Sequence, residues 1–157
     1  MSAIMPTYGR LPVTFASGAG AYLTDQKGRQ YLDALSGIAV TNLGHSHPSV
    51  TRAVTEQAES LLHTSNLYGI AQQERLAAEL NQLTGMERIF FCNSGAEANE
   101  TAIKMARRHG HNQGIANPQI VVLEGAFHGR TMGALSATGS AATVSYTHLT
   151  LPTNGLV

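Results

Sequence analysis

The chain has 157 residues, of which 43% are hydrophobic and 13% are charged. This composition is typical of a folded globular protein and excludes a disordered polypeptide. Ten basic and ten acidic residues give a net charge of zero, which argues against a nucleic-acid partner or an anionic membrane surface. The single cysteine excludes an internal disulfide, and without a recognisable signal peptide or membrane-spanning run the sequence predicts a cytoplasmic protein.

Residues 10–35 carry the signals of a β-hairpin. The stretches 21–24 and 29–32 flank a turn at 25–28, and Gly28 stands where such a turn needs a positive φ. We therefore expect two short antiparallel strands in this part of the chain.

Two amphipathic helices are predicted after the hairpin. The first spans 48–62, because Pro48 suits the first helical position and apolar residues recur on one face. The second spans 71–83 and ends near Gly85. The apolar residues of the two faces are Val50, Val54, Ala58 and Leu61 in the first helix, and Leu76, Leu80 and Leu83 in the second.

The stretch 93–99, Asn-Ser-Gly-Ala-Glu-Ala-Asn, is the most informative part of the chain. It follows a strand-like apolar run at 89–92 and opens a helical pattern that is expected to end near Gly110. The first turn of a helix has backbone N–H groups without partners and the positive end of the helix dipole, so it can bind a phosphate. Gly95 and Ala96 are small enough to let a phosphate approach the backbone.

A helix cap is the simpler interpretation of the same stretch. Ser94 as N-cap with Glu97 three residues later forms a capping box. The cap explains these two residues, but it does not explain the small pair between them.

A second apolar run, at 120–123, is typical of a buried parallel strand and precedes Phe127, His128 and Arg130. Neighbouring parallel strands end at one edge of a sheet, so Phe127 and Arg130 are expected near the phosphate pocket. An aromatic face, a guanidinium and a phosphate cradle favour a flat phosphorylated cofactor beside an acidic substrate. The alternative is a core phenylalanine and a surface arginine.

These motifs resemble those of the class III pyridoxal-phosphate aminotransferases. The resemblance covers roughly residues 5–139 in order, and it depends mainly on Asn93-Ser94-Gly95-Ala96-Glu97-Ala98-Asn99-Glu100 and Phe127-His128-Gly129-Arg130-Thr131. It implies an incomplete α/β, fold-type-I transferase of the aspartate aminotransferase-like kind. Residues 1–50 would form an N-terminal arm and part of a small domain, and 51–141 the start of a large, mainly parallel-sheet domain. Residues 142–157 do not match the family pattern, and we hypothesise that they are foreign sequence.

The resemblance implies that pyridoxal 5′-phosphate is the cofactor. Its phosphate would be bound at Ser94, Gly95 and Ala96, and its ring would stack on Phe127. His128 would shape the cofactor pocket, with a general base as the alternative role. Arg130 would receive a substrate carboxylate through its forked guanidinium.

No catalytic residue is assigned in this chain. Its two lysines, Lys27 and Lys104, do not match the family's catalytic lysine, so the chain by itself is expected to be inactive. The closely spaced histidine pairs His45/His47 and His109/His111 lack the carboxylate cluster and the i, i+4 helical spacing of a metal site, so no metal is expected.

Within the family, the ending Asn99-Glu100 and the stretch 133–139 favour one reaction. It transfers the distal amino group of N2-acetyl-L-ornithine to 2-oxoglutarate, giving glutamate, in a homodimeric enzyme of arginine biosynthesis. The alternatives are other class III substrates, namely succinylornithine, succinyldiaminopimelate, ornithine and 4-aminobutyrate, or a non-catalytic phosphate-binding remnant.

Overall fold

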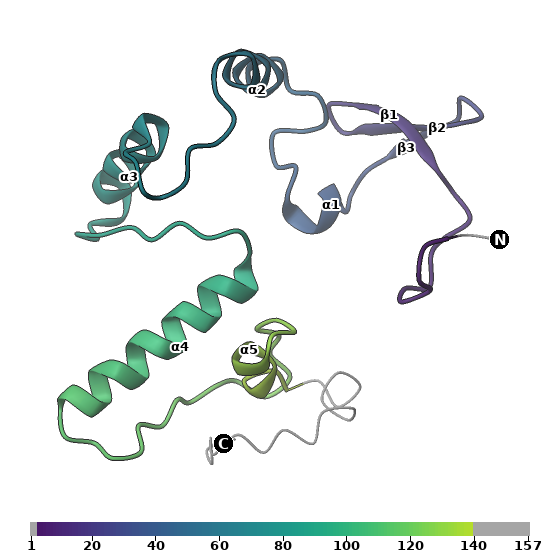
Figure 1. Cartoon of the computed structure of the whole chain (residues 1–157). Helices are drawn as coiled ribbons and strands as arrows, with labels where there is room; N and C mark the ends of the chain where they lie inside the picture. Colours follow the sequence, from purple (N-terminus) through teal and green to yellow (C-terminus); the bar gives the residue numbers. More distant parts are fainter. Residues whose placement is uncertain (1–2, 140–157) are drawn as a thin grey trace. The chain divides into compact units, whose positions relative to one another are not determined.

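A computed structural model describes residues 3–139 of the chain (Figure 1). The chain divides into two compact units, Met1–Ile70 and Ala71–Val157. The first unit contains β1 (Phe15–Ala19), β2 (Tyr22–Asp25), β3 (Gln30–Leu32), α1 (Ser36–Ala39) and α2 (Pro48–Ser60). The second contains α3 (Ala71–Thr84), α4 (Gly95–Asn112) and α5 (Met132–Ser136). The division of the family pattern into domains at residues 50 and 141 stays a prediction, and the hypothesis about residues 142–157 lies outside the described residues.

The sheet of the first unit is an antiparallel meander in the order β1-β2-β3. The predicted hairpin is confirmed, because Tyr22 pairs with Leu32 and Thr24 with Gln30. Gly28 has φ +79° in the connecting turn, a conformation in which glycine carries no steric penalty. The additional strand β1 pairs with β2 on the side away from β3.

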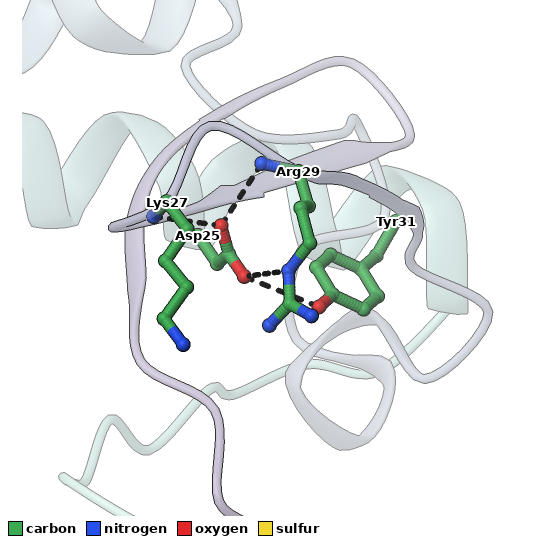
Figure 2. Close-up of polar contacts among 4 residues, drawn as sticks. All are labelled: Asp25, Lys27, Arg29 and Tyr31. Carbon is green, nitrogen blue, oxygen red and sulfur yellow. Dashed lines mark hydrogen bonds and ion pairs between the residues drawn. The ribbon is translucent and has the colours of Figure 1, made fainter.

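A buried carboxylate, Asp25, fixes the hairpin turn (Figure 2). Its Oδ1 accepts the backbone N–H groups of Lys27 at 2.8 Å and Arg29 at 2.9 Å. Its Oδ2 accepts Nε–H of Arg29 at 2.7 Å and the hydroxyl of Tyr31 at 3.2 Å. Burial by itself raises the pKa of Asp25, but the hydrogen bonds from Arg29, Lys27 and Tyr31 together outweigh it, so the pKa is lowered. The turn therefore depends on an ionised Asp25.

A second carboxylate, Asp33, joins the end of the sheet to the loop that precedes α2. Its Oδ2 lies 2.7 Å from Nε2 of His45, and its Oδ1 accepts the N–H groups of Leu35 and Ser36. The bond with His45, followed by that from Ser36, lowers the pKa of Asp33. His45 also exchanges two backbone hydrogen bonds with Gly20. The loop is therefore fixed to the sheet both by the side chain of His45 and by its backbone.

The helices predicted for 48–62 and 71–83 are confirmed as α2 and α3, with Pro48 in the first turn of α2. Their apolar faces are not covered within the described chain, since Val54 is 63% exposed and Leu83 is 82% exposed. A helix long and apolar enough to cross a bilayer is not found among residues 3–139.

The helix α4 begins where the sequence predicts but ends later than expected. It continues through Gly110 to Asn112, and Gly114, with φ +79°, terminates it instead. The N–H of Ile115 bonds the carbonyl of Gly110, and the N–H of Gly114 bonds that of His111, which is the Schellman arrangement. Gly110 is needed for packing, because a Cβ there would lie 2.7 Å from the ring of Pro118.

The two runs predicted to be strands, 89–92 and 120–123, are not strands in the described part of the chain. A parallel strand is defined by hydrogen bonds to its neighbours, and the sheet described in residues 3–139 contains only β1, β2 and β3. Several of their apolar side chains are accordingly exposed, with Phe90 at 67% and Leu123 at 80%, and the others are half-buried. The two runs thus have the composition of buried strands without the partners that would bury them.

Candidate functional site

The N-terminus of α4 has the cap that the sequence predicts. Ser94 has an extended backbone, and its Oγ accepts the N–H of Glu97 at 3.2 Å. The carboxylate of Glu97 reaches back to the N–H of Asn93 at 2.6 Å, one residue before the position of a standard capping box. Among the described residues, the N–H groups of Gly95 and Ala96 have no hydrogen-bond acceptor. The cap therefore satisfies the N–H groups of Asn93 and Glu97 and leaves those of Gly95 and Ala96 available.

The loop that carries Phe127 and Arg130 lies against this same helix end. Gly129 has φ +133° and packs so closely that a Cβ there would lie 2.8 Å from Cβ of Ala96 and 3.0 Å from Cβ of Ala134. Both the backbone conformation and the contact exclude a larger residue. The small side chain of Ala96 is thus needed for the contact with this loop.

Hydrogen bonds hold the peptide groups next to Gly129. Nδ2 of Asn99 donates to the carbonyl oxygen of His128 at 2.6 Å. On the other side, the N–H of His128 donates to Oγ1 of Thr138 at 3.1 Å. Thr138 is buried, and its hydroxyl also lies 2.9 Å from the carbonyl oxygen of Ala134. The backbone of the loop is therefore bound from α4 and from Thr138, two residues after α5.

Glu100, in the second turn of α4, caps the short helix α5. Its Oε1 accepts the N–H of Gly133 at 2.7 Å and that of Ala134 at 3.1 Å. These are the groups that an N-cap side chain normally satisfies, but Thr131 at the N-cap makes no such bond and its hydroxyl bonds Glu100 instead. Hydrogen bonds from Thr131 and Ala134 lower the pKa of Glu100, and Lys104 one turn further along adds a smaller effect.

The structure gives the site residues predicted from sequence different degrees of exposure. Ser94 and Gly95 are exposed and Ala96 is half-buried. Phe127 is 63% exposed, so it is not a core residue of the described chain. The side chain of Arg130 is on the surface, and His128 is half-buried, with its Nε2 buried and without a partner in the described residues.

Sequence reasoning missed the residues that hold the site together, namely Asn99, Glu100, Gly129 and Thr138. Asn99 and Glu100 belong to a motif that was used to choose a substrate, and Gly129 lies within the motif of Phe127 and Arg130. A helix start followed by an Asn-Glu pair on the next turn does not reveal which loop the pair binds. That information lies in contacts 29 to 34 residues apart in sequence.

Comparison with known proteins identifies the family. A family model described as "Aminotransferase class-III" matches residues 4–154. The chain belongs to the class III aminotransferases. The fold of this family is the α/β, fold-type-I transferase fold that the resemblance implied, of which the described residues form a part.

Similar curated proteins are named acetylornithine aminotransferases. That of Nitrosomonas europaea is 61% identical over 140 residues, which are 89% of this chain and 36% of that protein. That of Gloeobacter violaceus is 49% identical over 150 residues, which are 95% of this chain and 38% of that protein. The chain therefore spans a little over a third of the length of these relatives.

Similar solved structures are class III transaminases. The N-acetylornithine aminotransferase of Stenotrophomonas maltophilia K279a is 44% identical with a TM-score of 0.72, covering 78% of this chain and 34% of that one. The ornithine aminotransferase of Toxoplasma gondii ME49 is 28% identical with a TM-score of 0.91, covering 99% of this chain and 37% of that one.

Proposed function

We propose that this chain forms the phosphate-binding part of a pyridoxal-phosphate-dependent aminotransferase that transfers the distal amino group of N2-acetyl-L-ornithine to 2-oxoglutarate. The observation that carries the proposal is at the start of α4, where Gly95 and Ala96 present two N–H groups without acceptors among the described residues. The names of relatives that are 49% to 61% identical support the substrate. The reaction would serve arginine biosynthesis in the cytoplasm, in a homodimeric enzyme.

The residues at the N-terminus of α4 fit a phosphate monoester. The amides of Gly95 and Ala96 and the positive end of an 18-residue helix favour a bound anion. Ser94 already accepts a hydrogen bond from Glu97, but its hydroxyl proton can still be donated to a phosphate oxygen. A Cβ at residue 95 would have no atom within 4 Å, so space remains at this position.

Two side chains of the neighbouring loop would orient the cofactor and the substrate. The exposed ring of Phe127 offers a flat apolar face for a pyridine ring. The guanidinium of Arg130 offers a forked donor for the carboxylate of either substrate. When bound, pyridoxal phosphate supplies a conjugated ring that accepts electrons from the substrate carbon. The reaction would also need a lysine to carry the proton. Among the described residues, neither Lys27 nor Lys104 makes a hydrogen bond to this loop.

A full-length chimera tests the proposal. Residues 1–139 of this chain replace the matching part of the Nitrosomonas europaea relative, which supplies the remaining length. We expect the chimera to bind pyridoxal phosphate, to lose its yellow colour on addition of N2-acetyl-L-ornithine, and to form glutamate from 2-oxoglutarate. A chimera that folds but binds no cofactor, or that prefers ornithine or 4-aminobutyrate, would refute the proposed function.

Arg130 gives the specific control. In the chimera, Arg130→Lys should raise KM for both carboxylate substrates about 10- to 100-fold, because a charged hydrogen bond is lost. The matched variant Arg108→Lys changes an exposed arginine on α4 and should leave both KM values unchanged. Equal effects of the two substitutions on KM would show that Arg130 does not bind the substrate carboxylate.

A further inference from the structure

We infer that Asn99 and Glu100 are positioning residues, which fix the loop of Phe127 and Arg130 to the first two turns of α4 and so set the distance between the phosphate cradle and the ring and carboxylate sites. The inference rests on the proposed function for the purpose of the loop, but the attachment itself is independent of it. Neither side chain needs to touch cofactor or substrate for this role.

The two residues hold different parts of one segment. Asn99 donates to the carbonyl oxygen of His128 at 2.6 Å, directly after Phe127. Glu100 accepts the N–H groups of Gly133 and Ala134, shortly after Arg130. The segment between these points is therefore fixed at both ends to adjacent residues of a single helix. Because α4 also provides the amides of the predicted phosphate site, one rigid element positions all the ligand-binding groups.

Packing makes this attachment tight. Gly129, near the start of the segment, lies against Ala96 with no space for a Cβ. Ala134, next to the amides bound by Glu100, is completely buried. A loop held only by packing could slide along the helix, but directional hydrogen bonds at both ends fix its register.

The charge of Glu100 strengthens the cap that it provides. A carboxylate at a helix N-terminus accepts shorter and stronger hydrogen bonds than a neutral group. The hydroxyl of Thr131 and the N–H of Ala134 lower the pKa of Glu100, so the carboxylate stays ionised near neutral pH. A glutamine at this position keeps an acceptor oxygen and loses the charge, whereas an alanine loses both.

Hydrogen exchange of the dilute 157-residue chain tests the attachment. In Glu100→Ala, the protection of the amides of Gly133 and Ala134 should fall about tenfold or more, and Glu100→Gln should give a smaller loss. Asn99→Ala should deprotect the loop around residue 128. The matched variants Glu79→Gln and Asn112→Ala alter exposed helical residues and should leave these amides unchanged. Unchanged exchange in Glu100→Ala would overturn the inference.

The full-length chimera tests the positioning role. Asn99→Ala and Glu100→Gln should lower kcat/KM about 10- to 100-fold, while phosphate affinity and the unfolding midpoint change little, because misplacement of a reacting group is costly. A purely structural role would instead lower cofactor binding and the unfolding midpoint together. Parental kcat and KM in both variants would overturn the inference. Loss of activity in the unsubstituted chimera would overturn the proposed function only, since hydrogen exchange still decides the attachment.

Discussion

Replacing Gly129 with alanine is the most direct test of the contact between the loop and α4. The new Cβ would lie 2.8 Å from Cβ of Ala96 and 3.0 Å from Cβ of Ala134, distances at which atoms must move. The φ of +133° adds backbone strain of about 1–3 kcal/mol. Overpacking costs about 1–3 kcal/mol more, so we expect a local destabilisation of about 2–6 kcal/mol.

The amide of Leu135 reports this loss. Leu135 is 8% exposed, and its N–H donates to the carbonyl of Thr131 at 2.7 Å, so its exchange requires the segment to open. A destabilisation of at least about 2 kcal/mol lowers its protection roughly 30-fold or more. Hydrogen exchange of the dilute chain measures this change.

Substitutions at two other glycines separate backbone strain from the steric overlap of the new Cβ. Gly125 has φ +71° with no atom within 4 Å of a Cβ, so Gly125→Ala measures backbone strain without a collision. Gly95 has open space and no positive φ, so Gly95→Ala should change little. If Gly129→Ala lowers the protection of Leu135 no more than Gly125→Ala does, the close contact with Ala96 is wrong.

Three further predictions concern the hairpin, the end of α4 and the exposed apolar surface. The folded pKa of Asp25 lies below the ordinary value of 3.8, so its stabilisation of the turn is present above that pH and is lost as the pH falls through the lower folded value. Amide exchange at Lys27 should show this loss, and Asp25→Asn should abolish the pH dependence. Gly110→Ala places a Cβ 2.7 Å from Pro118 and should cost about 1–3 kcal/mol, measured as faster exchange at Ile115, although alanine favours helix. With Leu83 82% exposed and the predicted strands unpaired, expression at high concentration should give aggregate or partly ordered protein, and a sharp cooperative melt from a clean dimer would contradict this.

Local sequence patterns predicted the local structure well. The hairpin turn at Gly28, the start of α2 at Pro48 and the cap at Ser94 depend on residues within one turn of each other. The predicted end of α4 near Gly110 was too early, because two glycines compete to end the helix. Gly110 packs against Pro118 inside the helix, and Gly114 takes the positive φ that ends it.

The strand predictions failed for a different reason. The runs 89–92 and 120–123 have the apolar composition of buried strands, but a strand exists only when neighbouring strands satisfy its backbone N–H and C=O groups. Partners for these runs are not present in residues 3–139. The apolar composition of the two runs indicates burial, but it does not show which strands would form hydrogen bonds with them.

By itself, the sequence determined the family and the kinds of side chain at the candidate site. Ser94, Gly95, Ala96, Phe127 and Arg130 stand in short motifs that can be recognised from neighbouring residues alone. Only the tertiary structure decided how those motifs are joined. Asn99 reaches the carbonyl of His128, and Glu100 caps a helix more than 30 residues away. Such contacts depend on how the chain returns to α4, and helical periodicity and cap signals describe only one element at a time.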